Sequence, residues 1–271
     1  MSLLVFTDLD GSLMEHETYS IEPAREILQT LISREIPVVI NSSKTAREIE
    51  AVQKLLGFTA AFVSENGAQL CLPNANEIHE FGQPRDNWLE QVHQIRAQGN
   101  YHFAGFYDWT ALEISDLTGL SHEQANLAKI RRYSEPILWR DSATTRARFE
   151  QQLGQLGLRL LEGGRFLSIQ SHYDKSHAMN WMIEHQSRST KNEPVITVAL
   201  GDSPNDEGML NRADIAVVIK SAKSERITIN GPKKVIRTKR PGPAGWQDSM
   251  TEILKLYDSG QLNGIGNHAQ H

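Results

Sequence analysis

The sequence predicts an α/β fold, in which a mostly parallel sheet carries a second, inserted domain. In the first 71 residues, short apolar segments typical of buried strands alternate with single amphipathic helices, and the same alternation resumes at residue 175. Between Pro84 and about Ser168 this pattern loosens, and the length of 271 residues suits one core with an inserted unit. Strands separated by single helices are joined by parallel crossovers, so we expect helices on both faces of the sheet.

The first part of the expected core contains three strands and two helices. Buried strands are predicted at residues 3–8 and 37–41, and a third within 60–72. Amphipathic helices are predicted at 21–35 and 44–57. The order of these elements is strand, helix, strand, helix, strand.

Local signals support these elements. Pro23 is expected in the first turn of its helix, and Gly57 is expected to end the second one. The pair Asn66 and Gly67 predicts a hairpin-like return after the third strand. The second helix is expected to place its apolar side chains on one stripe, formed by Ile49, Val52, Leu55 and Leu56.

The second part of the core has the same alternation. Residues 175–185 and 205–213 are predicted to be helical, and 195–200 and 214–219 to be strands. We therefore expect two halves of one sheet on either side of the insertion.

These patterns give the domain boundaries. Residues 1–83 and 169–258 are assigned to the core, and 84–168 to the inserted domain. The segment 259–271 has few apolar residues and is expected to be a disordered tail.

Composition excludes several classes of function. The formal net charge is −5, which argues against non-specific binding to nucleic acid or to an anionic membrane. No apolar segment approaches the roughly 18–20 residues that span a bilayer, and the segment MSLLVFTD lacks the features of a signal peptide. The single cysteine, Cys71, lies in an apolar run and is expected to be a buried structural thiol. We expect a cytoplasmic protein.

Basic residues are concentrated between Lys220 and Arg240, where eight of them stand against one acid, Glu225. A solvated loop and a rim that faces an anion are both compatible with this stretch.

Two aspartates directly follow the first strand. Asp8 and Asp10 stand two residues apart, so in extended backbone their carboxylates lie on the same side. Two such charges about 4 Å apart repel by roughly 4 kcal/mol at an effective dielectric near 20. We therefore expect a positive group between them.

More polar residues follow the other strands. Asn41, Ser42, Ser43 and Lys44 come after the second strand, Asp202 and Asp206 follow 195–200, and Lys175 begins the helix before it. Ligands of open α/β sheets bind beyond the carboxyl ends of the strands, so we expect these groups to converge there. Several carboxylates without a cysteine and histidine cluster indicate Mg²⁺ and argue against zinc.

This set of groups is suited to phosphoryl transfer. Asp8 can attack phosphorus and form an aspartyl-phosphate, while Asp10 can protonate the leaving oxygen and later deprotonate water. Ser42 or Ser43 can donate a hydrogen bond to the transferring oxygens, and Lys175 can offset the charge of Asp8 and of phosphate. The metal ligands are expected to be Asp8, Asp10, Asp202 and Asp206.

Four segments together resemble known motifs. DLDGSL, NSSKT, DKSHAM and GDSPNDEGML resemble motifs one to four of the haloacid dehalogenase-like (HAD) phosphatases, in order, over residues 4–220. The resemblance implies a Rossmann-like parallel core and Mg²⁺-dependent phosphatase activity. It also implies that the insertion is an α+β cap of type IIB, as in the Cof-like subgroup, which would lie over the active site. Asp206 then acts on the metal through water, or orients Lys175.

NSSKT and four further segments resemble one family within this group. NSSKT, SENGA, RRYSEP, GGRF and GPAGW are similar to segments of mannosyl-3-phosphoglycerate phosphatases. The resemblance implies hydrolysis of 2-O-(α-mannosyl)-3-phosphoglycerate to mannosylglycerate, a compatible solute, and phosphate. A phosphatase of another sugar phosphate, a phosphosugar mutase-like relative and a non-enzymatic phosphosugar-binding protein are the alternatives. The sequence leaves the oligomeric state open.

Substrate contacts are expected from both domains. An arginine of the insertion could bind a substrate carboxylate, Glu135 could bind sugar hydroxyls, and adjacent glycines allow the backbone to approach a ligand. The residues expected to bind the phosphorylated sugar are Ser43, Lys44, Glu65, Asn66, Arg132, Glu135, Gly164, Arg165 and Asn205.

Overall fold

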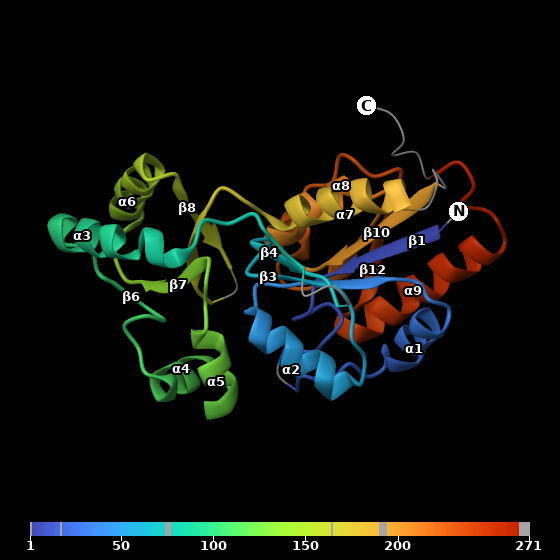
Figure 1. Cartoon of the computed structure of the whole chain (residues 1–271), viewed down its shortest axis with the longest axis horizontal. Coiled ribbons are helices and arrows are strands. Elements are labelled where there is room, and N and C mark those ends of the chain that lie inside the picture. Colours follow the sequence, from blue (N-terminus) through green and yellow to red (C-terminus); the bar gives the residue numbers. More distant parts are fainter. Residues whose placement is uncertain (1, 17, 74–76, 164, 190–193, 266–271) are drawn as a thin grey trace.

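The computed structural model describes residues 2–16, 18–73, 77–163, 165–189 and 194–265. Among these residues the strands form two sheets, one of eight strands and one of four, which lie in the two lobes of the molecule (Figure 1). In the same described ranges, no helix has both the length and the apolarity needed to cross a membrane.

The larger sheet confirms the predicted α/β class. Its order is β12-β11-β10-β1-β2-β3-β4-β5, and the pairs from β12 to β3 are parallel, whereas β4 and β5 are added antiparallel. The strands from β1 to β5 are Ser2–Thr7, Val38–Asn41, Phe62–Ser64, Gln69–Cys71 and Ile78–Glu80. The later strands β10, β11 and β12 are Val195–Gly201, Ile215–Lys220 and Lys234–Pro241.

Helices cover both faces of this sheet (Figure 1). On one side lie α1 (Arg25–Ser33), α2 (Ala46–Leu56) and α9 (Gly242–Asp258), and on the other α7 (Lys175–Ser189) and α8 (Glu207–Arg212). Side chains alternate along each strand, so in β1 Leu3 and Val5 join the first core, whereas Leu4 and Phe6 join the second. Burial on both faces explains the continuous apolar runs in the sequence.

The smaller sheet belongs to the inserted domain, which we call the cap and define as residues 85–171. Its order is β6-β7-β9-β8, with β6 at Phe103–Gly105, β7 at Ser134–Trp139, β8 at Leu158–Glu162 and β9 at Leu167–Ser171. A short 3-10 helix, η1 (Arg85–Asn87), begins the cap, and α3 (Leu89–Gly99) and α6 (Ala143–Gln155) pack on one face of its sheet. The helices α4 (Ala111–Thr118) and α5 (His122–Lys129) form a separate pair, and α5 contacts α2 of the core.

One predicted boundary divides a strand. The predicted start of the second core segment at residue 169 falls inside β9, whose whole length pairs with β7 and β8 of the cap. The two chain segments that connect the core and the cap meet at this point, because the Gln83 amide donates a hydrogen bond to Ser171 Oγ at 3.0 Å. The chain therefore returns to the core after Ser171.

Two details of the predicted helices differ. The helix expected at 21–35 begins at Arg25, so Pro23 precedes it, and Leu55 is 76% exposed instead of joining the apolar stripe. Leu55 is six residues after Ile49, which turns it about 120° away from the face that Ile49 buries. Val52 and Leu56 do pack against the core.

The sequence predicted neither β12 nor α9 at the C-terminal end of the core. The basic stretch is not one solvated loop, because residues 234–241 form β12 and Ser224–Arg226 form a 3-10 helix. After α9, residues 259–265 form turns in which Leu262 is 1% exposed and packs on the core, where the sequence predicted disorder. Residues 266–271 of the predicted tail lie outside the described residues.

Candidate active site

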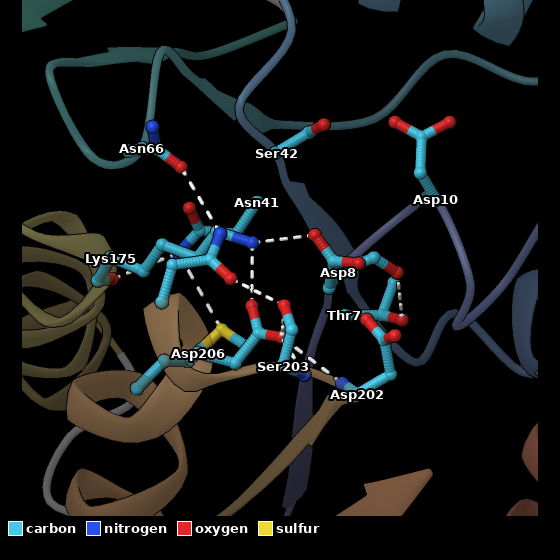
Figure 2. Close-up of polar contacts among 12 residues, drawn as sticks. Thr7, Asp8, Asp10, Asn41, Ser42, Asn66, Lys175, Asp202, Ser203 and Asp206 are labelled. Carbon is cyan, nitrogen blue, oxygen red and sulfur yellow. Dashed lines mark hydrogen bonds and ion pairs between the residues drawn. The ribbon is translucent and has the colours of Figure 1, made fainter. Parts of the chain in front are cut away.

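The carboxyl ends of three neighbouring strands bring the predicted groups together. Asp8 follows β1, Ser42 follows β2 and Asp202 follows β10, while Lys175 begins α7. Figure 2 shows Asp8 at the centre, with Lys175, Asp206 and Asp202 on its sides. The topology explains this convergence, since β2 and β10 are the two neighbours of β1.

Asp8 has a fixed backbone. Its amide donates to the Leu200 carbonyl at 2.8 Å, and its carbonyl accepts a hydrogen bond from Thr7 Oγ1 at 2.7 Å. Thr7 Oγ1 in turn accepts from the indole of Trp246, at 3.0 Å. Trp246 is fully buried in α9, so the segment GPAGW supports the backbone of Asp8 through Thr7.

Lys175 bridges two carboxylates. Its Nζ lies 2.5 Å from Asp8 Oδ1 and 2.6 Å from Asp206 Oδ1, and its side chain is completely buried. Burial alone would lower the pKa of Lys175, but the charges of Asp206 and Asp8 outweigh it and raise that pKa. The ammonium is therefore charged at neutral pH.

Asp206 holds this lysine and its own loop. Its Oδ2 accepts hydrogen bonds from the amides of Asp202 and Ser203, both at 3.0 Å, while its Oδ1 accepts from Lys175. Both oxygens are thus engaged by the protein. Of the two roles considered for Asp206, the geometry favours orientation of Lys175.

The carboxylates form a site with excess negative charge. Among the described residues, ligand atoms of Asp8, Asp202 and Asp206 lie within 4.8 Å of one another. Burial, then Asp206 and Asp202, raise the pKa of Asp8, and the Lys175 cation opposes this change. Three carboxylates and one ammonium leave two negative charges uncompensated when all are ionised, and oxygen ligands of this kind fit Mg²⁺. The donor set is therefore suited to the expected metal.

Asp10 is placed apart from this cluster. Its carboxylate points away from Asp202 and Asp206 (Figure 2) and lies 3.1 Å from Lys44 Nζ. Lys44 also lies 3.9 Å from Glu48; burial lowers its pKa, but Asp10 and Glu48 raise it by more. Among the described residues, the carboxylates close enough to share a metal ion are those of Asp8, Asp202 and Asp206, without Asp10. The role of Asp10 as an acid or base stays a prediction.

The two serines after β2 differ in burial. Ser42 is 1% exposed, whereas Ser43 is exposed and its carbonyl accepts a hydrogen bond from Arg131. Ser42 therefore fits the phosphate role better. Neither serine caps α2, because Thr45 is the N-cap residue and forms a capping box with Glu48.

The hairpin between β3 and β4 approaches this edge. The Asn66 amide donates to the Ser42 carbonyl at 2.9 Å, and Asn66 Oδ1 accepts from Asn205 Nδ2 at 3.3 Å. Glu65 is buried, but its carboxylate accepts hydrogen bonds from residues 132–134 of the cap. The Glu65 carboxylate is thus bound by the cap, and its expected contact with a substrate stays a prediction.

The predicted cap residues have protein partners as well. Arg132 pairs with Glu80 at 3.1 Å, and Glu135 is buried between Arg85 at 2.9 Å and the Tyr107 amide at 2.7 Å. Burial of Glu135 raises its pKa, and the Tyr107 amide and Arg85 oppose this change.

Arg165 is exposed and donates to the Leu117 carbonyl, and Gly164 lies outside the described residues. Each of the described cap residues predicted to bind substrate, Arg132, Glu135 and Arg165, is thus engaged by another part of the protein.

Sequence reasoning missed His16 and Ser221 at this edge, because no local signal marks them. His16 Nε2 lies 3.9 Å from Asp202 Oδ2, and the Asp202 carboxylate raises the pKa of His16. Ser221 Oγ donates to the Asp202 carbonyl at 2.6 Å. Asn41, which was expected here from its place at the end of β2, donates from Nδ2 to the Lys175 carbonyl at 2.8 Å.

Cys71 does not belong to the site. It lies in β4, and burial raises the pKa of its thiol to about 11, which keeps it protonated at neutral pH.

Known structures share this architecture. A haloacid dehalogenase-like hydrolase from Bacteroides thetaiotaomicron superposes with a TM-score of 0.67 at 16% identity, covering 93% of this chain and 100% of that one. A structure described as a HAD subclass IIB sugar phosphatase gives a TM-score of 0.67 at 16% identity, with 93% and 99% coverage. A third, from B. subtilis and described as a haloacid dehalogenase-like hydrolase, gives 0.68 at 16% identity, with 93% and 98% coverage. At such identity these similarities establish the fold.

The sequence itself matches a family model. The model describes a haloacid dehalogenase-like hydrolase and matches residues 5–142, about half of the chain. The matched region contains Asp8, Asp10 and Ser42 together with a large part of the cap. The chain belongs to the haloacid dehalogenase-like hydrolases.

Proposed function

We propose that the protein is a Mg²⁺-dependent phosphomonoesterase that hydrolyses a phosphorylated sugar, with 2-O-(α-mannosyl)-3-phosphoglycerate as its substrate. One observation carries the activity: a fully buried lysine joins Asp8 to Asp206 while a third carboxylate, Asp202, lies beside them. Such a cluster costs stability without a cation and suits a reaction in which negative charge is transferred.

Asp8 and Asp202 would hold Mg²⁺, and Asp206 would support them. The bound ion would neutralise negative charge of the phosphoryl group. Asp8 is the nucleophile, and because Lys175 binds Oδ1, Oδ2 is the oxygen that attacks phosphorus. The bond between phosphorus and the 3-oxygen of the glycerate breaks as the Asp8–phosphorus bond forms. Lys175 and the Ser42 hydroxyl donate hydrogen bonds toward the new charge.

Asp10 handles the protons. In the first step its carboxylic acid protonates the leaving oxygen, and in the second its carboxylate takes a proton from water. That water attacks the aspartyl-phosphate, releases inorganic phosphate and regenerates the Asp8 carboxylate. Lys44, which lies 3.1 Å from Asp10, holds the acid–base group in place.

The substrate is proposed from the resembling segments, and the cap is proposed to select it. A structural neighbour is described as a sugar phosphatase, which supports a phosphorylated sugar in general. The engagement of Arg132 by Glu80 and of Glu135 by Arg85 favours a second candidate, a different sugar phosphate, since these residues are occupied in the structure.

Phosphate release tests both levels of this proposal. The purified protein is assayed with and without Mg²⁺ on 2-O-mannosyl-3-phosphoglycerate and a panel of sugar phosphates, with Asp8→Asn as the control variant. We expect a kcat/KM for the mannosyl compound about a hundredfold above the panel, equivalent to roughly 2.7 kcal/mol, and none in the variant. Similar activity on the whole panel would retain the chemistry and refute the substrate. No Mg²⁺-dependent release from any compound would refute the activity.

A further inference from the structure

The hairpin residue Glu65 makes an unusual contact between the two domains. Its carboxylate, which belongs to the core, accepts hydrogen bonds from three donors of the cap. They are the Arg132 amide at 2.9 Å, the Tyr133 amide at 3.1 Å and the Ser134 hydroxyl at 2.6 Å. Glu65 is 2% exposed, so these bonds are shielded from water.

The backbone of the same turn is tied to the active site. The Glu65 amide donates to the Lys44 carbonyl and the Asn66 amide donates to the Ser42 carbonyl, both at 2.9 Å. Glu65 and Asn66 have positive φ angles of 49° and 62°, a conformation that non-glycine residues adopt rarely and that the surrounding bonds must hold. One strained turn therefore joins the segment after β2 to the cap.

A second contact strengthens this connection. Arg131 Nη1 donates to the Ser43 carbonyl at 3.2 Å and to Ser134 Oγ at 3.0 Å, and Ser134 Oγ donates to Glu65. The cap segment 131–134 is thus bound to Ser43, which adjoins Ser42, and to Glu65, whose amide donates to the Lys44 carbonyl. A displacement of the cap would break these bonds and leave the buried Glu65 carboxylate without its donors.

We propose that Glu65 is a positioning residue that holds the cap over Asp8 and Asp10, so that it determines selectivity among substrates without contacting the phosphoryl group. The inference rests on the proposed phosphatase function. Substrates recognised by the cap depend on this contact, because their binding requires the closed arrangement. A small aryl phosphate depends on it less, since its reaction needs mainly the core.

Glu65→Gln tests the proposal, because the amide keeps the size but turns an N–H donor toward a backbone amide. We expect the ratio of kcat/KM for 2-O-mannosyl-3-phosphoglycerate to that for p-nitrophenyl phosphate to fall about tenfold, mainly through KM of the mannosyl compound. Glu162→Gln is the matched control, since Glu162 is a cap carboxylate that pairs with Arg226 of the core at 3.3 Å on the exposed surface. That variant should keep the ratio of the wild-type protein.

Amide hydrogen exchange supplies a readout that needs no turnover. In Glu65→Gln the amides of Arg132 and Tyr133 should exchange about tenfold faster than in the wild-type protein, with little change elsewhere in the cap. Ser134→Ala, which removes one of the three donors, should shift both readouts in the same direction by less, and it decides the question if Glu65→Gln does not fold.

Several outcomes would overturn the proposal. An equal loss for both substrates would make Glu65 part of the chemistry, and unchanged selectivity with faster exchange would make the contact merely structural. If the wild-type protein prefers another sugar phosphate, that compound replaces the mannosyl one in the ratio. If it hydrolyses no phosphomonoester, the proposed function falls, and unchanged exchange in the variant would separately refute the contact.

Discussion

Lys175 is the residue on which the site's charge balance depends. It is completely buried and lies between Asp8 and Asp206, so its removal leaves two buried carboxylates without their cation. We expect Lys175→Met to lower the free energy of unfolding by about 3–5 kcal/mol and to abolish activity. Urea unfolding and phosphate release check this, with Lys234→Met as the control, since its pair with Glu252 is solvent-accessible and worth about 1 kcal/mol or less.

The free energy of unfolding that Lys175 contributes should change with pH in one defined direction. The folded-state pKa of Lys175 is raised, so its stabilisation is fully present below the unfolded value of about 10.4 and is lost only as pH rises through the folded value. The difference between wild type and Lys175→Met should therefore be constant from about pH 6 to about pH 9 as far as Lys175 is concerned. A difference that vanished within this range would contradict a charged Lys175.

Asp202 adds a third negative charge to the carboxylate cluster. In the absence of Mg²⁺ its charge repels Asp8 and Asp206, and two charges about 4 Å apart repel by roughly 4 kcal/mol at an effective dielectric near 20. We expect Asp202→Asn, measured in EDTA, to be more stable than wild type by about 1–3 kcal/mol. The gain should increase as pH rises through the raised pKa of Asp8, because the metal-free wild type loses stability there.

Addition of Mg²⁺ should reverse this order. Wild type should gain about 2.7 kcal/mol at a metal concentration a hundredfold above its Kd, whereas Asp202→Asn should gain little. Thermal unfolding with EDTA or MgCl₂ measures both, with exposed Asp86→Asn as the control. An Asp202→Asn protein that is less stable than wild type in EDTA would show that repulsion does not dominate the cluster.

At the scale of elements, the turn between β3 and β4 has no room for a side chain at Gly67. A Cβ there would lie 2.0 Å from the Asp174 carbonyl oxygen, and the φ angle is +105°. Because Lys175 follows Asp174, we expect Gly67→Ala to cost about 2–4 kcal/mol and to reduce kcat. Gly119 also has a positive φ, +80°, but a Cβ there would have no atom within 4 Å. Gly119→Ala should therefore cost about 1 kcal/mol and leave kcat unaltered. Equal effects at the two glycines, measured by urea unfolding and kcat, would refute the close approach.

The sequence was most informative for elements with a strong local signal. The strands β1, β2 and β10 were predicted because their sequences are apolar runs, which the structure buries on both faces of the sheet. The pair Asn66 and Gly67 predicted the hairpin. By contrast, β12 is a half-exposed edge strand rich in basic residues, so neither alternation nor an apolar run identified it. The prediction that Leu55 joins the apolar stripe is wrong, because an apolar side chain is buried only if its angular position on the helix faces the core.

At the scale of the whole molecule, the sequence anticipated the convergence of groups at the sheet edge but not their partners in the cap. Because the carboxyl ends of parallel strands meet at one edge of a sheet, the convergence of Asp8 and Asp202 there could be predicted, together with Lys175 at the start of its helix. The strand order that makes β2 and β10 the neighbours of β1 was not predicted. The cap partners of Glu65 could not be derived, because they depend on how the two domains dock. The pairing of Glu135 with Arg85 could not be derived either, because it depends on packing within the cap and no local pattern encodes it.

In the proposed mechanism Asp8 carries the phosphoryl group during turnover. Acid quenching of the protein during the first turnover with Mg²⁺ and 2-O-mannosyl-3-phosphoglycerate, or with the best substrate of the panel, followed by mass spectrometry of its peptides, tests this step. We expect one added phosphoryl group on the peptide that contains Asp8, and none in Asp8→Asn. Phosphate release without a phosphorylated Asp8 peptide at any quench time would contradict it.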